Sequence, residues 1–218
     1  MDTLEAIRRR RAVRQYTDQP VEDEQNDRLL KHALRAPTGS GAQAWSLLVV
    51  RDPELRRQVA ELIIAGGATY FGIMRPRKEG VSEEEHAAWA ADYAEQTLGT
   101  YRDAPVWIVG AVVPGRYPPQ MQQGGYEDDV ISLAFAIENL MLAARAEGLG
   151  TCPTTAFQRF EKDRLREILG IPPEVDPTIV TPVGHPVAWP EGLAPALKRN
   201  FRSWRALVHD DRWGATRA

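Results

Sequence analysis

The chain has very little of what most metal and disulfide chemistry needs. Cys152 is the only cysteine among its 218 residues, which excludes an internal disulfide and any site built from several cysteines. The histidines, four in all, are scattered, and no pair has the His-x-x-x-His spacing of a helical metal site. No Gly-x-Ser-x-Gly motif marks a serine nucleophile. The sequence therefore predicts no resident metal and no self-sufficient nucleophile.

An excess of one charge and a long hydrophobic run are also missing. Lys and Arg total 27 and Asp and Glu total 30, a net charge of −3, so bulk charge does not direct the protein to nucleic acid or to a membrane. The most apolar stretch, residues 130–144, is shorter than the roughly 20 residues of a spanning helix and contains Glu138 and Asn139. The N-terminus lacks the apolar core of a signal peptide. We therefore expect a cytoplasmic protein with neither nucleic acid nor a membrane as partner.

What is present is the composition of an ordinary globular domain. Hydrophobic residues make up 43% of the chain and charged residues 26%, and the length suits one domain, 1–218, with a real core. Capping residues, proline positions and apolar periodicity place helices and short strands among each other, which indicates an α+β or α/β fold. Helices are expected over 3–9, 22–35, 53–66, 82–98, 129–147 and 161–169, and strands over 46–50, 105–113 and 178–183.

The expected central helix is apolar nearly all round. From Val130 to Ala146 its polar residues are Ser132, Glu138, Asn139 and Arg145. Such a helix must be covered on most of its surface, and one small sheet cannot do this alone. We therefore expect an obligate dimer packed around the helix, with a central helix inside a monomer as the alternative.

A run of arginines follows the first helix. Arg8, Arg9, Arg10, Arg11 and Arg14 place five guanidiniums within seven residues, and guanidiniums bind phosphate oxygens in pairs of hydrogen bonds. This run alone does not decide between phosphate binding and a solvated basic end of the helix.

Two further segments are rich in small residues. The loop 36–45 contains Pro37, Thr38, Gly39, Gly41 and Gln43, which would let a ligand approach the backbone closely. The segment 148–155 follows the central helix and contains two glycines, a proline and the cysteine, which we interpret as a small buried hydrophobic residue. The sequence thus offers a candidate anion-binding site and a pocket of small residues, but no complete set of catalytic side chains. This combination indicates that a phosphorylated cofactor carries the chemistry.

Together these segments resemble the nitroreductase family of flavin enzymes. The similarity runs through Ala6-Ile7-x-x-Arg10-Arg11-Ala12-Val13-Arg14-x-Tyr16, the loop from Ala36 to Trp45, and Asn139 to Ala144 followed by Gly148-Leu149-Gly150. It ends with Pro182-Val183-Gly184-His185-Pro186 and Lys198-Arg199. The matches span most of the chain in the family's order.

The resemblance implies an α+β fold with a mixed sheet flanked by helices, and an FMN-binding homodimer whose long central helix lies at the interface. It also implies that the flavin carries the chemistry, so no side chain is assigned as catalytic. By carry-over, the cofactor-binding residues would be Arg10, Arg11, Ala12, Arg14, Pro37, Thr38, Gly39, Gly41, Gln43, Pro153, Thr154, Thr155, Lys198 and Arg199. The loop 37–43 would reach the flavin from the partner subunit.

Three positions depart from the family's pattern. Ala12 stands where serine is usual, Gly41 where asparagine is common and Ala44 where proline is common. The first removes a hydrogen bond to phosphate, and the second removes a group that addresses the ring edge. The donor and acceptor could therefore differ from those of a typical member.

The least family-like region, within 66–125, is the expected substrate lid. Its aromatic residues are candidates to stack on a planar substrate, although packing within the protein is an equal alternative for two of them, Trp89 and Tyr93. The candidates are Tyr70, Phe71, Trp89, Tyr93 and Tyr117.

The expected activity is an FMN-dependent, two-step exchange. NADH or NADPH would reduce the flavin, and a planar electron-poor small molecule, a nitroaromatic or a quinone, would then be reduced in the same place. A biosynthetic dehydrogenase, a flavin-consuming enzyme of the same fold, and a non-enzymatic module for a phosphorylated ligand are the alternatives.

Overall fold

A computed structural model of the chain describes residues 1–114, 125–192 and 202–216. The helices are α1 (Thr3–Arg9), α2 (Asp23–Ala33), α3 (Pro53–Met74), α4 (Glu83–Leu98), α5 (Gly125–Ala146) and α6 (Lys162–Leu169). The strands are β1 (Trp45–Val50), β2 (Val106–Val112), β3 (Gly150–Thr151) and β4 (Asp176–Gly184). Single 3-10 turns are η1 (Gly39–Gly41), η2 (Gly99–Asp103), η4 (Ala156–Arg159) and η5 (Trp204–Ala206).

The four strands form one sheet in the order β1-β2-β4-β3. Each neighbouring pair is antiparallel, with Val109 opposite both Leu48 and Val180. The α+β class is thus confirmed. The parallel pairing that a mixed sheet requires is confined, among the described residues, to an isolated bridge between Ala12 and Thr151.

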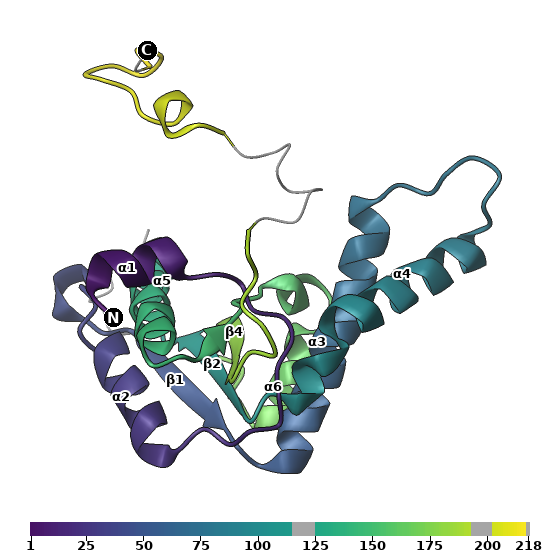
Figure 1. The fold of residues 1–218 in the computed structure, drawn as a ribbon, viewed down its shortest axis with the longest axis horizontal. Coiled ribbons are helices and arrows are strands. Elements are labelled where there is room, and N and C mark those ends of the chain that lie inside the picture. The colour runs from purple at the N-terminus through teal and green to yellow at the C-terminus, as the bar shows by residue number, and fades with distance from the viewer. Residues whose placement is uncertain (115–124, 193–201, 217–218) are drawn as a thin grey trace.

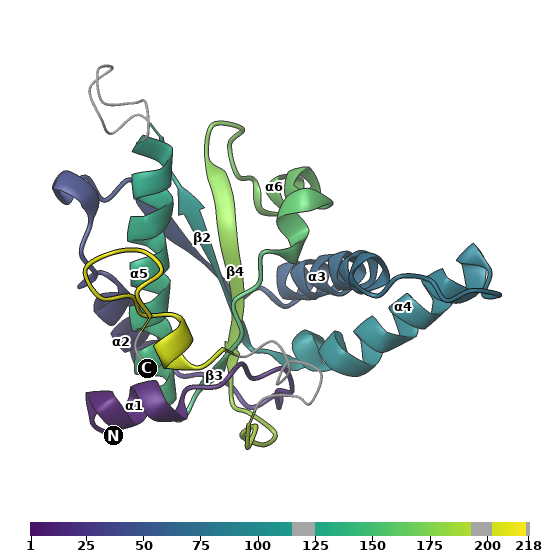
Figure 2. The same ribbon diagram turned by 90° about the horizontal axis from the view of Figure 1, so that it is seen from above.

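Helices cover both faces of this sheet. Figure 2 shows α1, α2 and α5 on one side of β2 and β4, and α3, α4 and α6 on the other. The fully buried strand β2 contributes side chains to the core on both faces of the sheet, because successive side chains of a strand point to opposite faces. Ile108 packs with α2 and α5, whereas Trp107 and Val109 pack with α3 and α6. Gly110 admits α5, since a Cβ there would lie 3.0 Å from Leu133 Cδ1.

Local capping signals place several helix ends as expected. Asp2 accepts a hydrogen bond from the Glu5 backbone N–H, and Ser82 with Glu85 forms a complete capping box before α4. Gly170 ends α6 in the left-handed conformation, with φ 62°.

The expected end of α3 at Gly66 and Gly67 is wrong. The helix continues to Met74. A Cβ on Gly67 would lie 2.6 Å from Leu98 Cδ1 of α4, so this glycine permits close helix packing and does not terminate the helix. The extension of α3 and the whole of α4 form the hairpin that projects from the body in Figure 1.

The described residues of the chain cover the central helix mainly on one side. Leu133, Ile137 and Leu140 are buried against the sheet, whereas Ile131 and Phe135 remain about half exposed, at 51% and 48%. The helix begins at Gly125, four residues before the expected start. The preceding loop lies almost entirely outside the described residues. None of the helices in the described part of the chain is long and apolar enough to cross a bilayer.

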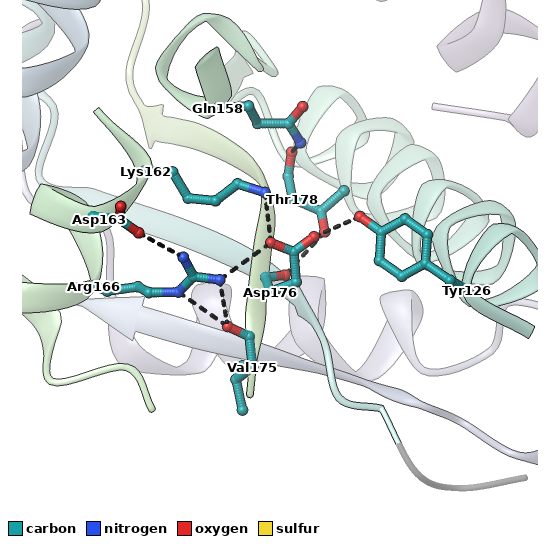
Figure 3. Close-up of polar contacts among 8 residues, drawn as sticks. All are labelled: Tyr126, Gln158, Lys162, Asp163, Arg166, Val175, Asp176 and Thr178. Atoms are coloured by element: carbon teal, nitrogen blue, oxygen red, sulfur yellow. Dashed lines mark hydrogen bonds and ion pairs between the residues drawn. The ribbon is translucent and has the colours of Figure 1, made fainter. Parts of the chain in front are cut away.

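A polar cluster anchors the start of α5 (Figure 3). Asp176 of β4 accepts a hydrogen bond from the Tyr126 hydroxyl and pairs with Lys162 Nζ of α6 at 2.6 Å. Arg166 of α6 approaches the same carboxylate at 3.5 Å and also donates to the Val175 carbonyl. This carboxylate therefore joins three elements.

Candidate functional site

A cavity of about 550 Å³ opens between α3 and the turn after β3. Tyr70, Phe71 and Met74 of α3 form its aromatic and apolar wall. The turn residues from Cys152 to Thr155 form a second wall, and Arg14 reaches the cavity from the N-terminal segment. The cavity thus combines an aromatic and apolar wall, a backbone turn and one guanidinium.

The N-terminal segment reaches the cavity because it packs on β3. The Val13 N–H donates to the Thr151 carbonyl at 3.0 Å, next to the Ala12–Thr151 bridge. The Tyr16 hydroxyl donates to the Val13 carbonyl at 2.7 Å, and the Thr100 hydroxyl donates to the Arg14 carbonyl at 3.0 Å. These bonds fix the backbone of Arg14 and leave its side chain exposed at the cavity.

The turn after β3 is held by the sheet. Thr154 and Val180 exchange two backbone hydrogen bonds, of 2.8 and 3.1 Å. Cys152 is 4% exposed and packs in the core, and its backbone N–H donates to the Thr181 hydroxyl at 3.1 Å. Its surroundings agree with the interpretation of a small buried hydrophobic residue.

Positive charge at the cavity comes from Arg14. None of the acidic groups in the described residues lies within ion-pair distance of its guanidinium, whereas Arg10 pairs with Glu138 at 3.3 Å. Arg11 donates to the carbonyls of Arg8 and Arg10, at 2.8 and 2.7 Å. Burial raises the pKa of the nearby Tyr101 hydroxyl well above its ordinary value, so this group stays neutral. Arg14 is therefore free to pair with an anionic group of a ligand.

The structure brings six of the predicted site residues together at this cavity: Arg14, Tyr70, Phe71, Pro153, Thr154 and Thr155. Arg10, Arg11 and Ala12 lie in the adjoining segment and do not line it. Tyr117, Lys198 and Arg199 fall outside the described residues.

Within one chain, the loop with Pro37, Thr38, Gly39, Gly41 and Gln43 does not reach the cavity. The Gly39 N–H donates to the Ser132 hydroxyl of α5 at 3.1 Å. Figure 2 shows the loop on the side of α5 away from α3. A role at the same site would require a second copy of the chain.

Trp89 and Tyr93 belong to an aromatic stack on α4. Their ring centroids lie 5.6 Å apart, and Phe71 contacts Tyr93 edge-on at 4.9 Å. Neither ring of α4 lines the cavity. Tyr93 supports its wall through Phe71, and Trp89 stacks on Tyr93.

The prediction missed the cavity residues Ile63, Met74, Leu98, Tyr101 and Phe160. Ile63, Gly67, Tyr70, Phe71 and Met74 recur with helical spacing on one side of α3. This signal could have found the wall, but only if the helix had been continued beyond Gly67.

The chain matches the nitroreductase family over residues 7–185. It belongs to the nitroreductase family. An FMN reductase (NADPH) of Bacillus subtilis is 30% identical over 213 residues, which are 96% of this chain and 74% of that protein. Iodotyrosine deiodinase 1 of Rattus norvegicus is 28% identical, over 89% of this chain and 65% of that protein.

Solved nitroreductase structures share the fold. The NfrA1 nitroreductase of Bacillus subtilis superposes with a TM-score of 0.71 at 25% identity, covering 99% of this chain and 76% of that one. The resemblance drawn from the sequence motifs is confirmed, as is an oxidoreductase of the nitroreductase type. Because the relatives carry names for different reactions, family membership leaves the acceptor open.

The site's residues fit a flavin nucleotide. A flat ring needs a slot with apolar faces, which the Tyr70–Phe71 wall supplies, and a hydrogen-bonding group at its edge, for which the backbone of Thr155 is the candidate because Thr154 is paired with Val180. A phosphate needs guanidiniums without committed partners, and within the described ranges Arg14 is one. Among the described residues, no group of three or more His, Cys, Asp or Glu side chains is placed to hold a metal ion.

Proposed function

We propose that this nitroreductase is an FMN-dependent NAD(P)H oxidoreductase that reduces a planar, electron-poor acceptor such as a nitroaromatic or a quinone. The observation that carries the proposal is the cavity itself. It joins the guanidinium of Arg14, which has no ion-pair partner among the described residues, the backbone turn 153–155 and the aromatic wall of α3 in one space. FMN, when bound, would supply the hydride acceptor and donor.

The chain's own residues have three tasks in this proposal. Arg14 binds the anionic part of the cofactor. Pro153 has no N–H and the Thr154 N–H donates to the Val180 carbonyl, so the turn 153–155 would present the Thr155 N–H to the ring, where it would stabilise negative charge. Tyr70 and Phe71 orient a planar ligand and exclude water from its face.

Donor and acceptor would use the same face in turn. The cavity is a single space, and none of the described residues that line it is acidic. Solvent can supply the protons, so no side chain is assigned as a general acid. With both substrates varied, initial rates should give parallel double-reciprocal lines, and intersecting lines would reject the shared-face exchange.

The proposal includes a homodimer built around α5. Ile131 and Phe135 of α5 and Leu4 and Ile7 of α1 are exposed, at 48% to 65%, and α1 packs against α5. A second copy on this surface would bury these side chains and could bring its loop 37–43 to the cavity. Sedimentation analysis should give twice the chain mass of 24.4 kDa. A cytoplasmic location stays a prediction.

The first test is the visible spectrum of the purified protein before and after anaerobic NADPH or NADH. A flavin spectrum that bleaches supports the proposal. A flavin spectrum that persists favours a dehydrogenase that draws electrons from its own substrate, and loss of the flavin during turnover favours a flavin-consuming enzyme. A colourless protein that takes up no FMN favours the binding module.

A further inference from the structure

The strand β3 lies at one edge of the sheet, where successive residues of an antiparallel strand direct their backbone groups to the neighbouring strand and to the outside in turn. Thr154 continues this edge, since it exchanges two backbone hydrogen bonds with Val180 of β4. Of the outward positions, the Thr151 carbonyl accepts the Val13 N–H at 3.0 Å, and Pro153 has no N–H. Thr155 is therefore the next residue with an outward N–H.

The peptide that joins Thr154 to Thr155 has a fixed direction. Its carbonyl accepts the Val180 N–H at 3.1 Å and so points at β4. In a planar trans peptide the N–H points opposite to the carbonyl, so the Thr155 N–H points away from the sheet. Thr155 lines the cavity, and its N–H has no hydrogen-bond partner among the residues that the structure describes.

Gln158 holds the chain where it turns away from β4. Its backbone N–H donates to the Thr155 carbonyl at 3.1 Å, and its side-chain amide donates to the Thr178 carbonyl (Figure 3). Thr178 precedes Val180 by two residues, so its carbonyl faces the same side of β4. A strand that continued past Thr154 would use that carbonyl. The chain turns into η4 instead, and the Gln158 amide takes the place of the next backbone donor.

The position of η4 relative to the sheet thus depends on one side-chain amide. Thr178 is 6% exposed, so loss of the amide would leave a buried carbonyl unpaired, which is unfavourable. The chain can avoid this by extending the strand past Thr154 and unwinding η4. The Thr155 side chain makes no capping hydrogen bond that would oppose such a change. Extension of the strand would displace the Thr155 N–H at the cavity.

We propose that Gln158 is a positioning residue for the reduction potential of the flavin. The inference rests on the FMN site proposed above. Gln158 keeps the Thr155 N–H in place at the edge of the ring, where this donor stabilises the negative charge that the ring gains on reduction. Without the Gln158 amide the donor is displaced, and the reduced state loses more stabilisation than the oxidised state. Gln158 itself does not line the cavity and acts through the turn.

The test measures the reduction potential of FMN bound to the wild-type protein and to Gln158→Met, which keeps the length of the side chain and removes the donor. The reduced form should become about tenfold less favoured, which lowers the potential of a two-electron couple by about 30 mV. Gln25→Met is the matched control. Gln25 Nε2 also donates to a backbone carbonyl, that of Glu147, at 3.3 Å, and neither residue lines the cavity. This variant should keep the wild-type potential.

Gln158→Asn provides a second variant that keeps the amide. Its side chain is one methylene shorter, so from the same backbone position the amide does not reach the Thr178 carbonyl. The potential should fall as it does in Gln158→Met. This variant decides the question if Gln158→Met fails to fold, as judged by thermal unfolding.

Two results would overturn the positioning role. An unchanged potential in either folded Gln158 variant, even with a lower thermal stability, would show that the hydrogen bond has a structural role only. An equal fall in Gln25→Met would show that the potential responds to any loss of this kind of hydrogen bond. A wild-type protein that binds no FMN would instead remove the proposed function, and the inference with it.

Discussion

Gly150 lies directly against the side chain of Val13, so that a Cβ on the glycine would be 2.7 Å from Val13 Cβ and 2.8 Å from both of its methyl groups. Val13 is 1% exposed and β-branched, so its side chain has no space to move into and few other rotamers to adopt. Because Val13 precedes Arg14, this contact sets how closely the arginine run approaches β3 and the cavity.

Gly150→Ala should therefore destabilise the protein by about 1–3 kcal/mol, the usual cost of overpacking a filled core. It should also weaken FMN binding, because Arg14 moves with Val13. Chemical denaturation and flavin titration measure the two effects. Gly192→Ala, at a glycine with open space around it, is the control. A stable Gly150→Ala protein with unchanged FMN affinity would contradict this account.

Tyr70 offers a test of the substrate side of the cavity. It lines the wall, is 40% exposed and meets Phe71 edge-on with ring centroids 5.9 Å apart. Tyr70→Ala should raise the KM for a planar acceptor about five- to tenfold, which corresponds to an aromatic contact of about 1 kcal/mol. Tyr70→Phe should retain the wild-type KM. If both variants behave alike, the ring does not orient the acceptor.

The parts of the fold that follow from neighbouring residues could be predicted from the sequence. The capping-box spacing of Ser82 and Glu85 predicts the start of α4, and Gly170 predicts the end of α6. Arg14 and residues 153–155, which the resemblance gave by carry-over, lie together at the cavity.

The parts of the fold that depend on contacts between remote segments could not be predicted from the sequence. A Gly-Gly pair such as Gly66-Gly67 usually ends a helix. Only the contact with the Leu98 side chain of α4 shows that Gly67 is a position where two helices pack closely. The two-residue strand β3 is too short for any periodicity and exists through its pairing with Val183 and Gly184. Tyr101 and Leu98 reach the cavity through the same α3–α4 packing, which explains why sequence reasoning missed them.

Arg102 joins α3 to α4 through two carboxylates. Its Nε and Nη2 donate to Glu61 at 2.6 and 2.9 Å, and its Nη2 also donates to Glu95 at 3.0 Å. These bonds hold the pKa values of Glu61 and Glu95 below their ordinary range. Arg102→Met should lower the free energy of unfolding by about 1–2 kcal/mol, more than an isolated surface pair, because one guanidinium serves both helices.

The comparison for Arg102 is Arg57→Met, which breaks a surface pair with Glu54 inside α3 and should cost less than about 0.5 kcal/mol. Because lowered carboxylate pKa values stabilise the folded state above the unfolded pKa, the deficit of Arg102→Met should shrink as the pH falls below the ordinary glutamate value. Equal costs for the two variants at neutral pH would show that the network does not couple the helices.

Tyr126 gives a prediction at the opposite end of the pH scale. Burial and the hydrogen bond to Asp176 raise the pKa of its hydroxyl to about 12, above the value of about 10 in an unfolded chain. The neutral phenol is the form that the folded state stabilises. This contribution is therefore complete below pH 10 and is lost as the pH rises towards 12.

Tyr126→Phe isolates this effect from the other tyrosines. At neutral pH the free energy of unfolding of the variant should be lower than that of the wild type by at most about 1 kcal/mol, since one partly exposed hydrogen bond is removed. The difference between wild type and variant should then shrink as the pH rises from about 10 to 12, in denaturation curves measured in parallel. A difference that stays constant or grows over that range would mean that the phenol does not bind Asp176, and that α5 is anchored at its start by other groups.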